Sequence, residues 1–231
     1  MEVVTSTLVI QFAKWPIPGS VKTRLAKHLG DARAFQVHCE LTAQVLCNLT
    51  RFKQADYQLW WDQPPHALSP DSPSGLQQLC QIVREVPMGG IPDMQQVQQG
   101  ENLGARMLHA LTKGLQRYQK VMIVGSDCPT VDVSYLAQAE TKLNSHDMVL
   151  IPAEDGGYVL LGVRRSALTT LPGVLLADIP WGTDVVLETT LNAAKRQSLA
   201  VGLLETTWDV DENDDYLAWL DRSSALDVKT P

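Results

Sequence analysis

The first candidates for chemistry in this chain of 231 residues are aspartates that follow apolar runs. Asp127 comes after the run Val121 to Val124, which is apolar throughout and predicts a strand buried on both faces. Gly125, Ser126 and Pro129 end this strand abruptly. Asp127 is therefore expected at the carboxyl end of a central strand, where open α/β sheets bind their ligands. A carboxylate in this place is either a metal ligand or a helix cap.

A second acidic segment follows the last predicted strand, at 199–204. Asp209 and Asp211 alternate in an extended stretch, which puts their side chains on the same side. Diphosphate chemistry commonly uses a divalent cation, and carboxylate oxygens are the ligands that Mg²⁺ or Mn²⁺ prefers. The competing interpretation is helix capping: Asp211 or Asn213 could begin the helix predicted at 213–220, and we assign the acidic residues at 214 and 215 to its first turn.

A third acidic position lies in the turn Asp155-Gly156-Gly157-Tyr158. Two glycines permit a tight turn or a close approach of the backbone to a ligand. Asp155 is therefore a candidate for holding an acceptor hydroxyl or for acting as a catalytic base. An ordinary hairpin with an Asp-Gly turn explains the same residues equally well.

Three cations lie close together in the loop after the first predicted strand, at Lys14, Lys22 and Arg24. Two prolines and a glycine stiffen this loop, and a short helix predicted at 23–29 follows it. Cations beside helix amide groups form a site for a diphosphate or triphosphate. Because the loop has neither the G-x-G-x-x-G nor the G-x-x-x-x-G-K-[ST] pattern, a solvated basic surface is an equal alternative.

The elements that must position these residues alternate between strands and helices along the whole chain. This alternation predicts an α/β fold, a Rossmann-like three-layer α/β/α sandwich with a mostly parallel sheet. Thr183 is the expected N-cap of the helix at 183–196, and Trp181 is either a stacking surface or part of the core. Strands are predicted at 7–12, 56–61, 83–86, 121–124, 147–151, 158–163 and 199–204, and the longer helices at 31–51, 75–81, 102–118, 133–143, 183–196 and 213–220.

Composition limits the class of protein. The length and a hydrophobic content of 45% suit a single domain, expected at 1–222 with a C-terminal tail at 223–231. A net charge of -7 argues against binding to nucleic acid or to an anionic membrane. The amino terminus shows no signal-peptide pattern, so we expect a cytoplasmic protein with a small-molecule partner. The four cysteines lack C-x-x-C spacing, and Cys128 is expected to be a packing residue.

Six motifs, taken in order, resemble those of a family of small bacterial GT-A-like nucleotide-diphospho-sugar transferases, some of them linked to arsenosugar biosynthesis. The resemblance covers nearly the whole chain, and this order of motifs is specific although each motif alone is modest. The motifs are Phe12-Ala13-Lys14 with Pro18-Gly19 and Val21-Lys22-Thr23-Arg24-Leu25, Gln99-Gly100-Glu101-Asn102-Leu103-Gly104-Ala105-Arg106-Met107, Gly125-Ser126-Asp127-Cys128-Pro129, Asp155-Gly156-Gly157-Tyr158, Ile179-Pro180-Trp181-Gly182-Thr183 and Asp209-Val210-Asp211.

The resemblance implies roles for several residues. In this fold, which phospholactate and molybdenum-cofactor guanylyltransferases share, the first loop holds phosphates and the segment beginning at Gln99 and Gly100 lies near the nucleotide base. The aspartate of the Gly-Ser-Asp-Cys-Pro motif, Asp127, binds the metal, and Asp211 completes the metal site. The chain departs from the family pattern at Asn102, where many relatives have Asp, and directly after Asp211, where they have threonine and proline.

The leading functional hypothesis is a metal-dependent transferase that moves a sugar from a nucleotide-diphospho-sugar to a small acceptor. Lys14, Lys22 and Arg24 would hold the diphosphate, with Asp155 at the acceptor. An alternative is a nucleotidyltransferase, similar to the guanylyltransferases, that joins a nucleoside triphosphate to a small phosphorylated acid and releases pyrophosphate. A second alternative is a non-catalytic nucleotide-binding protein, because a fold does not fix a function.

Overall fold

The described residues, 6–85 and 95–227 of the computed structural model, form one sheet in the order β3-β2-β1-β4-β6-β5-β7. Neighbouring strands are parallel except that β6 runs antiparallel to both β4 and β5. The mostly parallel α/β fold predicted from the sequence is confirmed. The strands are β1 (Thr7–Ala13), β2 (Ala55–Trp61), β3 (Gln95–Val97), β4 (Lys120–Gly125), β5 (Met148–Pro152), β6 (Tyr158–Arg164) and β7 (Val201–Leu203).

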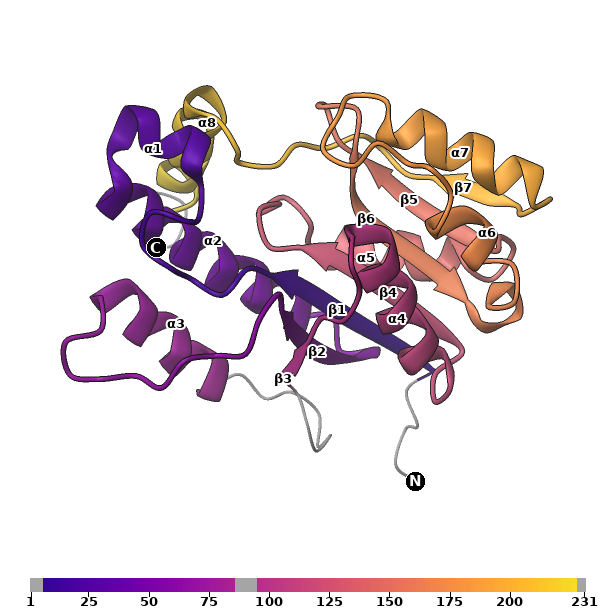
Figure 1. Cartoon of the computed structure of the whole chain (residues 1–231), viewed down its shortest axis with the longest axis horizontal. Helices are drawn as coiled ribbons and strands as arrows, with labels where there is room; N and C mark the ends of the chain where they lie inside the picture. Colours follow the sequence, from indigo (N-terminus) through magenta and orange to yellow (C-terminus); the bar gives the residue numbers. More distant parts are fainter. Residues whose placement is uncertain (1–5, 86–94, 228–231) are drawn as a thin grey trace.

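Helices cover both faces of this sheet, which gives three layers (Figure 1). Helices α2 (Asp31–Thr50), α3 (Ser74–Glu85) and α5 (Val133–Lys142) pack on one face. Helices α4 (Leu103–Leu115), α6 (Pro172–Leu175) and α7 (Val186–Arg196) pack on the other. A smaller cluster joins α1 (Thr23–Leu29) and α8 (Asn213–Asp227) to the outer side of α2. Helix α8 thus continues past residue 222, where we place the start of the tail.

Two element predictions were wrong near α3 and β3. Val83 was expected in a short strand but lies in α3, because Leu76, Leu79 and Val83 are buried on one helical stripe; residue 86 lies outside the described residues. Strand β3 was not predicted. Its sequence, Gln-Gln-Val, is exposed or half-buried at the edge of the sheet, so it lacks the apolar pattern that marks an internal strand.

The start of α7 also differs from expectation. Thr183 does not cap this helix, because its Oγ1 donates to the carbonyl of Pro180 at 2.8 Å and closes a local turn. Gly182 has a φ of +81°, a left-handed conformation that helices do not continue through. The helix begins at Val186, and Trp181 packs half-buried against the core. The segment before α7 is therefore a loop that reaches over the edge of the sheet.

A buried glutamine in the central strand fixes the turn after β4. Gln11 is 1% exposed, and its Nε2 donates to the Thr42 carbonyl and to Ser126 Oγ. Ser126 Oγ in turn donates to the Phe12 carbonyl at 2.8 Å. A buried polar side chain is retained at such a place when its hydrogen bonds specify one backbone arrangement. The turn that carries Asp127 is thus held directly by β1.

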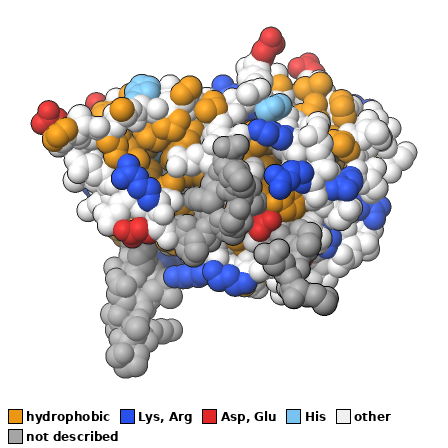
Figure 2. Space-filling view, turned by 90° about the horizontal axis from the view of Figure 1, so that it is seen from below, with side chains coloured by type: hydrophobic (Ala, Val, Ile, Leu, Met, Phe, Trp, Pro, Cys, Tyr) orange, Lys and Arg blue, Asp and Glu red, His pale blue; other side chains and the backbone are white. Residues whose placement is uncertain are grey.

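Figure 2, which views the molecule from below, shows a face on which Lys and Arg side chains lie among apolar ones. Within the described part of the chain, no helix combines the length and apolar character needed to cross a bilayer.

Candidate functional site

A cleft with two compartments lies at the carboxyl ends of β1 and β4, the edge predicted from the sequence. Phe12, Leu103 and Gly125 border both compartments. The cationic compartment, a cavity of about 430 Å³, is lined by Lys14, Lys22, Arg24, His38, Arg106, Asp127 and Asp211 among others. The apolar compartment, about 230 Å³, is lined by Met107, Ile123, Asp155, Tyr158, Leu161, Trp181, Thr183 and Asp209 among others.

Lys22 is not a solvated loop residue. Its side chain is 3% exposed, and its Nζ lies 2.8 Å from Asp127 Oδ2 and 3.9 Å from Asp211 Oδ1. The same ammonium group donates to the Val210 carbonyl at 2.5 Å. Its backbone has a φ of 49°, a left-handed conformation that is unfavourable for a residue with a Cβ. The fold accepts this strain at the start of α1, which directs the lysine into the carboxylates.

The carboxyl group of Asp127 is held in its charged form. Burial alone would raise its pKa, but the nearby charges of Lys22 and His38 hold the pKa below its ordinary value. The whole side chain is 40% exposed, whereas Oδ1 itself is buried and has no hydrogen-bond partner. Asp127 lines the cationic compartment as a residue, but its unpartnered oxygen is itself enclosed by protein. Asp127 does not cap the helix that follows it, since Asp132 does so, and its role as a metal ligand stays a prediction.

The late acidic segment is fastened to the turn that carries Asp127. The Val210 amide donates to the Asp127 carbonyl at 2.8 Å. Arg24 Nη1 lies 2.8 Å from Asp211 Oδ2, and this pair is largely exposed. Asp215 Oδ2 accepts from the amides of Asp211 and Glu212, so Asp215 takes the capping role expected for this cluster. Asp211 therefore lines the cationic compartment as the partner of Arg24 and not as a helix cap.

Asp127 and Asp211, the metal ligands predicted from the sequence, line the same compartment. Across residues 6–85 and 95–227, no group of three His, Cys, Asp or Glu side chains is placed to hold a metal ion. Mg²⁺ is nevertheless commonly bound by one or two carboxylates, with phosphate oxygens and water completing its shell. The ammonium group of Lys22 lies 2.8 Å from Asp127 and 3.9 Å from Asp211, so it now occupies part of the place that such a cation would take.

The other predicted ligand residues have mixed positions. Lys14 and Arg24 line the cationic compartment, as expected. Gln99 and Gly100 are exposed and line neither compartment. The cavity is instead lined by Gln98, which donates to the Trp60 carbonyl, and by Arg106, whose Nε donates to the Gly100 carbonyl at 3.2 Å. Arg106 was not singled out from the sequence, although it belongs to the second motif.

Asn102 explains one departure from the family pattern. Its Oδ1 accepts from the Ala105 amide at 2.9 Å and caps α4. Asp and Asn cap helices about equally well, so the replacement keeps the helix start. The amino terminus of α4, with Leu103 and Arg106, borders the cationic compartment and adds positive potential there.

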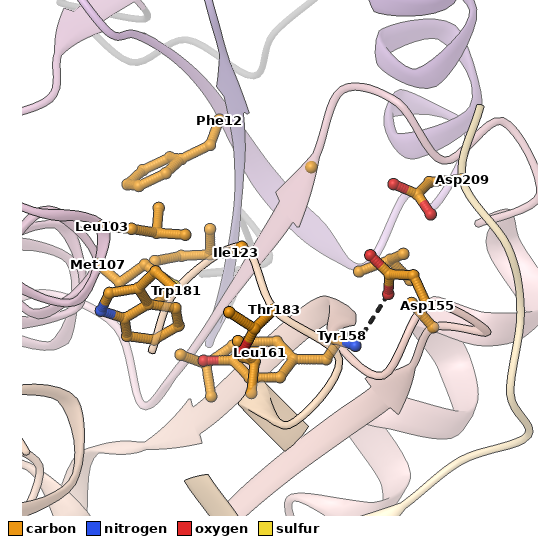
Figure 3. A pocket seen from close by; sticks show the side chains of 16 residues that line it. Phe12, Leu103, Met107, Ile123, Asp155, Tyr158, Leu161, Trp181, Thr183 and Asp209 are labelled. Carbon is orange, nitrogen blue, oxygen red and sulfur yellow. Dashed lines mark hydrogen bonds between the residues drawn. The ribbon is translucent and has the colours of Figure 1, made fainter. Parts of the chain in front are cut away.

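Two carboxylates form an acidic end of the apolar compartment, opposite Trp181 and Met107 (Figure 3). Asp155 Oδ1 accepts from the Gly157 amide at 2.8 Å, which fixes the side chain within the turn. Burial, together with the charges of Asp155 and Asp127, raises the pKa of Asp209 to about 6. Asp209 was considered only as a second metal ligand in the sequence. A carboxylate with this pKa is a suitable general base near neutral pH.

The hairpin turn and the loop before α7 are locked together at Gly156. This residue has a φ of +86°, and a Cβ here would lie 1.9 Å from the Asp184 carbonyl oxygen. The Gly156 carbonyl also accepts from the Leu187 amide at 2.9 Å. Both the hairpin and the ligand-site interpretations of this turn are therefore compatible with the structure, since β5 and β6 form an antiparallel pair whose turn borders the cavity.

We expect Gly156→Ala to lower the free energy of unfolding by about 2 to 4 kcal/mol, because a left-handed alanine is strained and its methyl group meets fixed backbone. Gly125→Ala is the matched control, since a Cβ there meets no atom within 4 Å and its effect should stay below about 1 kcal/mol. Urea unfolding of both variants measures the difference. Equal losses in the two variants would show that the contact with Asp184 is unimportant.

Cys128 is a packing residue, as predicted. Its side chain is 1% exposed, its Sγ donates to the Gly125 carbonyl, and burial raises the pKa of the thiol. A thiol in this state is a poor nucleophile. All four cysteines are free.

Comparison with known proteins supports the resemblance predicted from the motifs. Residues 84–183 match the model of DUF2064, a family described as "Uncharacterized protein conserved in bacteria". No curated protein matches the chain at a significant level. A solved structure from Desulfovibrio desulfuricans, described as a "putative nucleotide-diphospho-sugar transferase", has 29% sequence identity and a TM-score of 0.72, with 90% of this chain and 84% of that chain covered.

More distant solved structures share the fold alone. A 4-diphosphocytidyl-2C-methyl-D-erythritol synthase from Anaerococcus prevotii has 10% identity and a TM-score of 0.55, with 94% of this chain and 98% of that chain covered. A nucleotidyl transferase from Methanothermobacter has 12% identity and a TM-score of 0.54, with 94% and 97% covered. The chain thus carries the DUF2064 sequence pattern over residues 84–183, and its resemblance to the nucleotide-diphospho-sugar transferase group, predicted from six motifs, is confirmed.

Proposed function

We propose that the protein transfers a sugar from a nucleotide-diphospho-sugar to a hydroxyl group of a small acceptor, with the help of a divalent cation. A nucleotide-utilising transferase is the activity that the described relatives have in common. The proposal of sugar transfer in particular rests on the two unlike compartments of the cleft. In this proposal the cationic compartment takes the donor and the apolar compartment takes the acceptor.

The cationic compartment suits the diphosphate of the donor. Lys14, Arg24 and Arg106 border it, and the amino terminus of α4 points toward it. These charges stabilise the negative charge that develops on the departing diphosphate. A cation bound by Asp127 and Asp211 would neutralise part of the same charge. The volume of the cationic compartment, about 430 Å³, falls in the range of ordinary ligand sites.

One observation favours a hydroxyl acceptor over a phosphorylated one: the lining of the apolar compartment contains two aspartates and no Lys, Arg or His among the described residues. A phosphorylated acid, the acceptor in the alternative nucleotidyl transfer, would face Asp155 and Asp209 with no cation to offset the repulsion. A phosphate acceptor is also already a nucleophile and needs no base. A neutral hydroxyl does need one, and Asp209 can serve.

The proposed step is a direct displacement. The acceptor oxygen forms a bond to the anomeric carbon, while the bond from that carbon to the diphosphate oxygen breaks. Asp209 accepts the proton from the acceptor hydroxyl, and Asp155, fixed by the Gly157 amide, holds the acceptor in place. The nucleoside diphosphate leaves with the electron pair of the broken bond. Charge and protons balance within the cleft.

Asp127→Asn is expected to reduce metal-dependent transfer by a factor of about 100 or more, because the predicted metal ligand loses its charge. Asp214→Asn is the control, since Asp214 is an exposed acid on the same late segment as Asp211. Transfer is measured as nucleoside diphosphate release with Mn²⁺ and a panel of nucleotide sugars. Full activity in the Asp127 variant would remove Asp127 from the metal site.

Pyrophosphate release separates sugar transfer from nucleotidyl transfer. The protein is incubated with each nucleoside triphosphate, Mg²⁺ and phosphorylated acids such as phosphoglycerate, and pyrophosphate is measured. We expect none above background. Sustained release with one triphosphate and acceptor would show that the alternative reaction is correct.

A further inference from the structure

The two ends of the apolar compartment differ in polarity. Its acidic end is formed by Asp155 and Asp209, and its opposite end by Trp181, Met107 and Leu103 (Figure 3). A sugar acceptor with hydroxyl groups on all sides would leave several of them against apolar side chains, because the second end adds only the hydroxyl groups of Thr183 and Tyr158 to its apolar lining (Figure 3). An acceptor with one polar and one apolar part matches both ends at once.

We infer that the acceptor is an uncharged hydroxyl compound that carries one ring-sized apolar group, which lies between Trp181 and the start of α4. The molecule is an acceptor only under the proposed sugar transfer, on which this inference rests. It adds the chemical class of the molecule. The hydroxyl lies at the two aspartates and the ring lies at the tryptophan.

The size of the compartment limits the apolar group. A dry cavity of roughly 150 Å³ holds a benzene molecule. The apolar compartment, at about 230 Å³, therefore has room for one ring with its hydroxyl-bearing substituent. Trp181 stands edge-on to Tyr158, with ring centroids 6.4 Å apart, so both rings offer aromatic surface to such a group.

Exposure at the rim agrees with an apolar ligand. Leu103 borders the compartment and is 43% exposed, although it is a large hydrophobic residue in the first turn of α4. Trp181 is only half-buried, and its ring faces the cavity (Figure 3). Apolar surface that is left open beside polar groups is typical of small-molecule sites. Binding of a ring would cover both side chains.

The position of the cations that would bind the phosphates argues that this ring is not the nucleotide base. The cations lie on the other side of Phe12, Leu103 and Gly125, which border both compartments. A sugar joined to a diphosphate in the cationic compartment would reach this border, where the acceptor must meet it. The base would then lie farther along the cationic compartment, toward Asp62 and Gln98 at the ends of β2 and β3.

Three simple probes test the inference without a donor. Benzyl alcohol has the ring and the hydroxyl, glycerol has hydroxyls without a ring, and benzyl phosphate has the ring with an anionic group. Saturation-transfer NMR on the full chain should detect benzyl alcohol, with a dissociation constant on the order of 1 mM for a fragment of this size. Glycerol should give no saturable signal. Benzyl phosphate should bind at least about tenfold more weakly than benzyl alcohol, because the aspartates repel it.

Substitutions in the lining test whether benzyl alcohol binds in the apolar compartment. Trp181→Ala and Leu103→Ser should each weaken benzyl alcohol binding, the former by about tenfold or more, while Trp181→Phe should retain most of it. Leu203→Ala is the matched control, since Leu203 is equally exposed at 43% but lies on β7, outside both compartments. Urea unfolding shows whether each variant is folded. Leu103 is largely exposed, so its replacement keeps the test informative if the tryptophan variant is unstable.

The outcomes separate this inference from the proposed function. Benzyl alcohol binding that depends on Trp181 supports the inference even if no nucleotide sugar is turned over, in which case the proposed function alone fails. Transfer to glycerol that is equally fast in Trp181→Ala would overturn the inference and leave sugar transfer intact. Displacement of benzyl alcohol by a free nucleoside, with loss of nucleoside binding in Trp181→Ala, would also overturn it, because the compartment would then hold the base.

Discussion

Replacing Asp209 by Asn is expected to make the protein more stable while it nearly abolishes transfer. Burial and the charges of Asp155 and Asp127 raise the pKa of Asp209 to about 6 in the native state, whereas the ordinary value is 3.8. Above pH 6 the native state must therefore hold a carboxylate that its surroundings disfavour. A neutral amide of nearly the same shape removes this penalty.

The sign and the pH range follow from the two pKa values. Between about pH 4 and pH 6 the native state binds more protons at Asp209 than the unfolded state does, so stability falls as the pH rises through this range. The free energy of unfolding of Asp209→Asn should exceed that of the unmodified protein by about 1 to 3 kcal/mol at pH 8 and by almost nothing below pH 4. Urea unfolding at several pH values measures this difference.

Activity should change in the opposite direction. If Asp209 is the base, the rate of the unmodified protein rises with pH through about 6, and Asp209→Asn loses a factor of about 100 to 10,000 together with this inflection. Glu205→Gln, an exposed change shortly before Asp209, should alter neither stability nor rate. An Asp209→Asn protein that is less stable at pH 8, or that keeps the inflection near pH 6, would contradict the assignment.

Lys22→Met is expected to destabilise the protein by about 2 to 4 kcal/mol, because it leaves Asp127 and the Val210 carbonyl without their buried partner. The lower part of this range takes account of Asp127, whose side chain is 40% exposed and can gain water. Met and Lys are both unbranched at Cβ, so the strain of the left-handed backbone is unchanged. The loss of stability in Lys22→Met therefore measures what the ammonium group of Lys22 contributes.

A divalent cation should offset much of this loss. In Lys22→Met the two carboxylates keep their charge without the lysine, so Mn²⁺ in the millimolar range should raise the melting temperature of this variant more than that of the unmodified protein. The double variant Lys22→Met with Asp127→Asn should be more stable than Lys22→Met and should lose the response to Mn²⁺. Lys27→Met, on the exposed side of α1, should behave like the unmodified protein. Equal responses to Mn²⁺ in all variants would exclude Asp127 as a ligand.

The sequence was sufficient for the fold and for part of the site, for physical reasons that differ between residues. Strands such as β4 are continuous apolar runs, and α4 has a regular apolar stripe, so both could be predicted from local patterns. Asp127 could be located because the end of a buried strand is marked by glycine and proline. The position of Lys14 and Arg24 at the same edge follows from the parallel order of β1 and β4.

Other parts of the site depend on contacts that no local pattern contains. The pairing of Lys22 with Asp127 arises from a left-handed residue at the start of α1. The raised pKa of Asp209 comes from burial and from the charges of Asp155 and Asp127, which are distant in the sequence. Gln98 rather than Gln99 faces the cavity because the short edge strand β3 fixes which side chains point inward, and that strand has no apolar signature.

The reversed direction of β6 has a consequence for how such enzymes could diversify. In a fully parallel sheet, every loop at this edge leads into a helix on one face, so a change in its length disturbs the packing of a layer. The turn between β5 and β6 instead joins two adjacent strands and carries Asp155 into the apolar compartment. Residues of this turn other than Gly156, which is locked against Asp184, can be exchanged while the strand ladder and the cationic compartment stay as they are. Evolution could thus alter the acceptor through one short hairpin and leave the donor chemistry untouched.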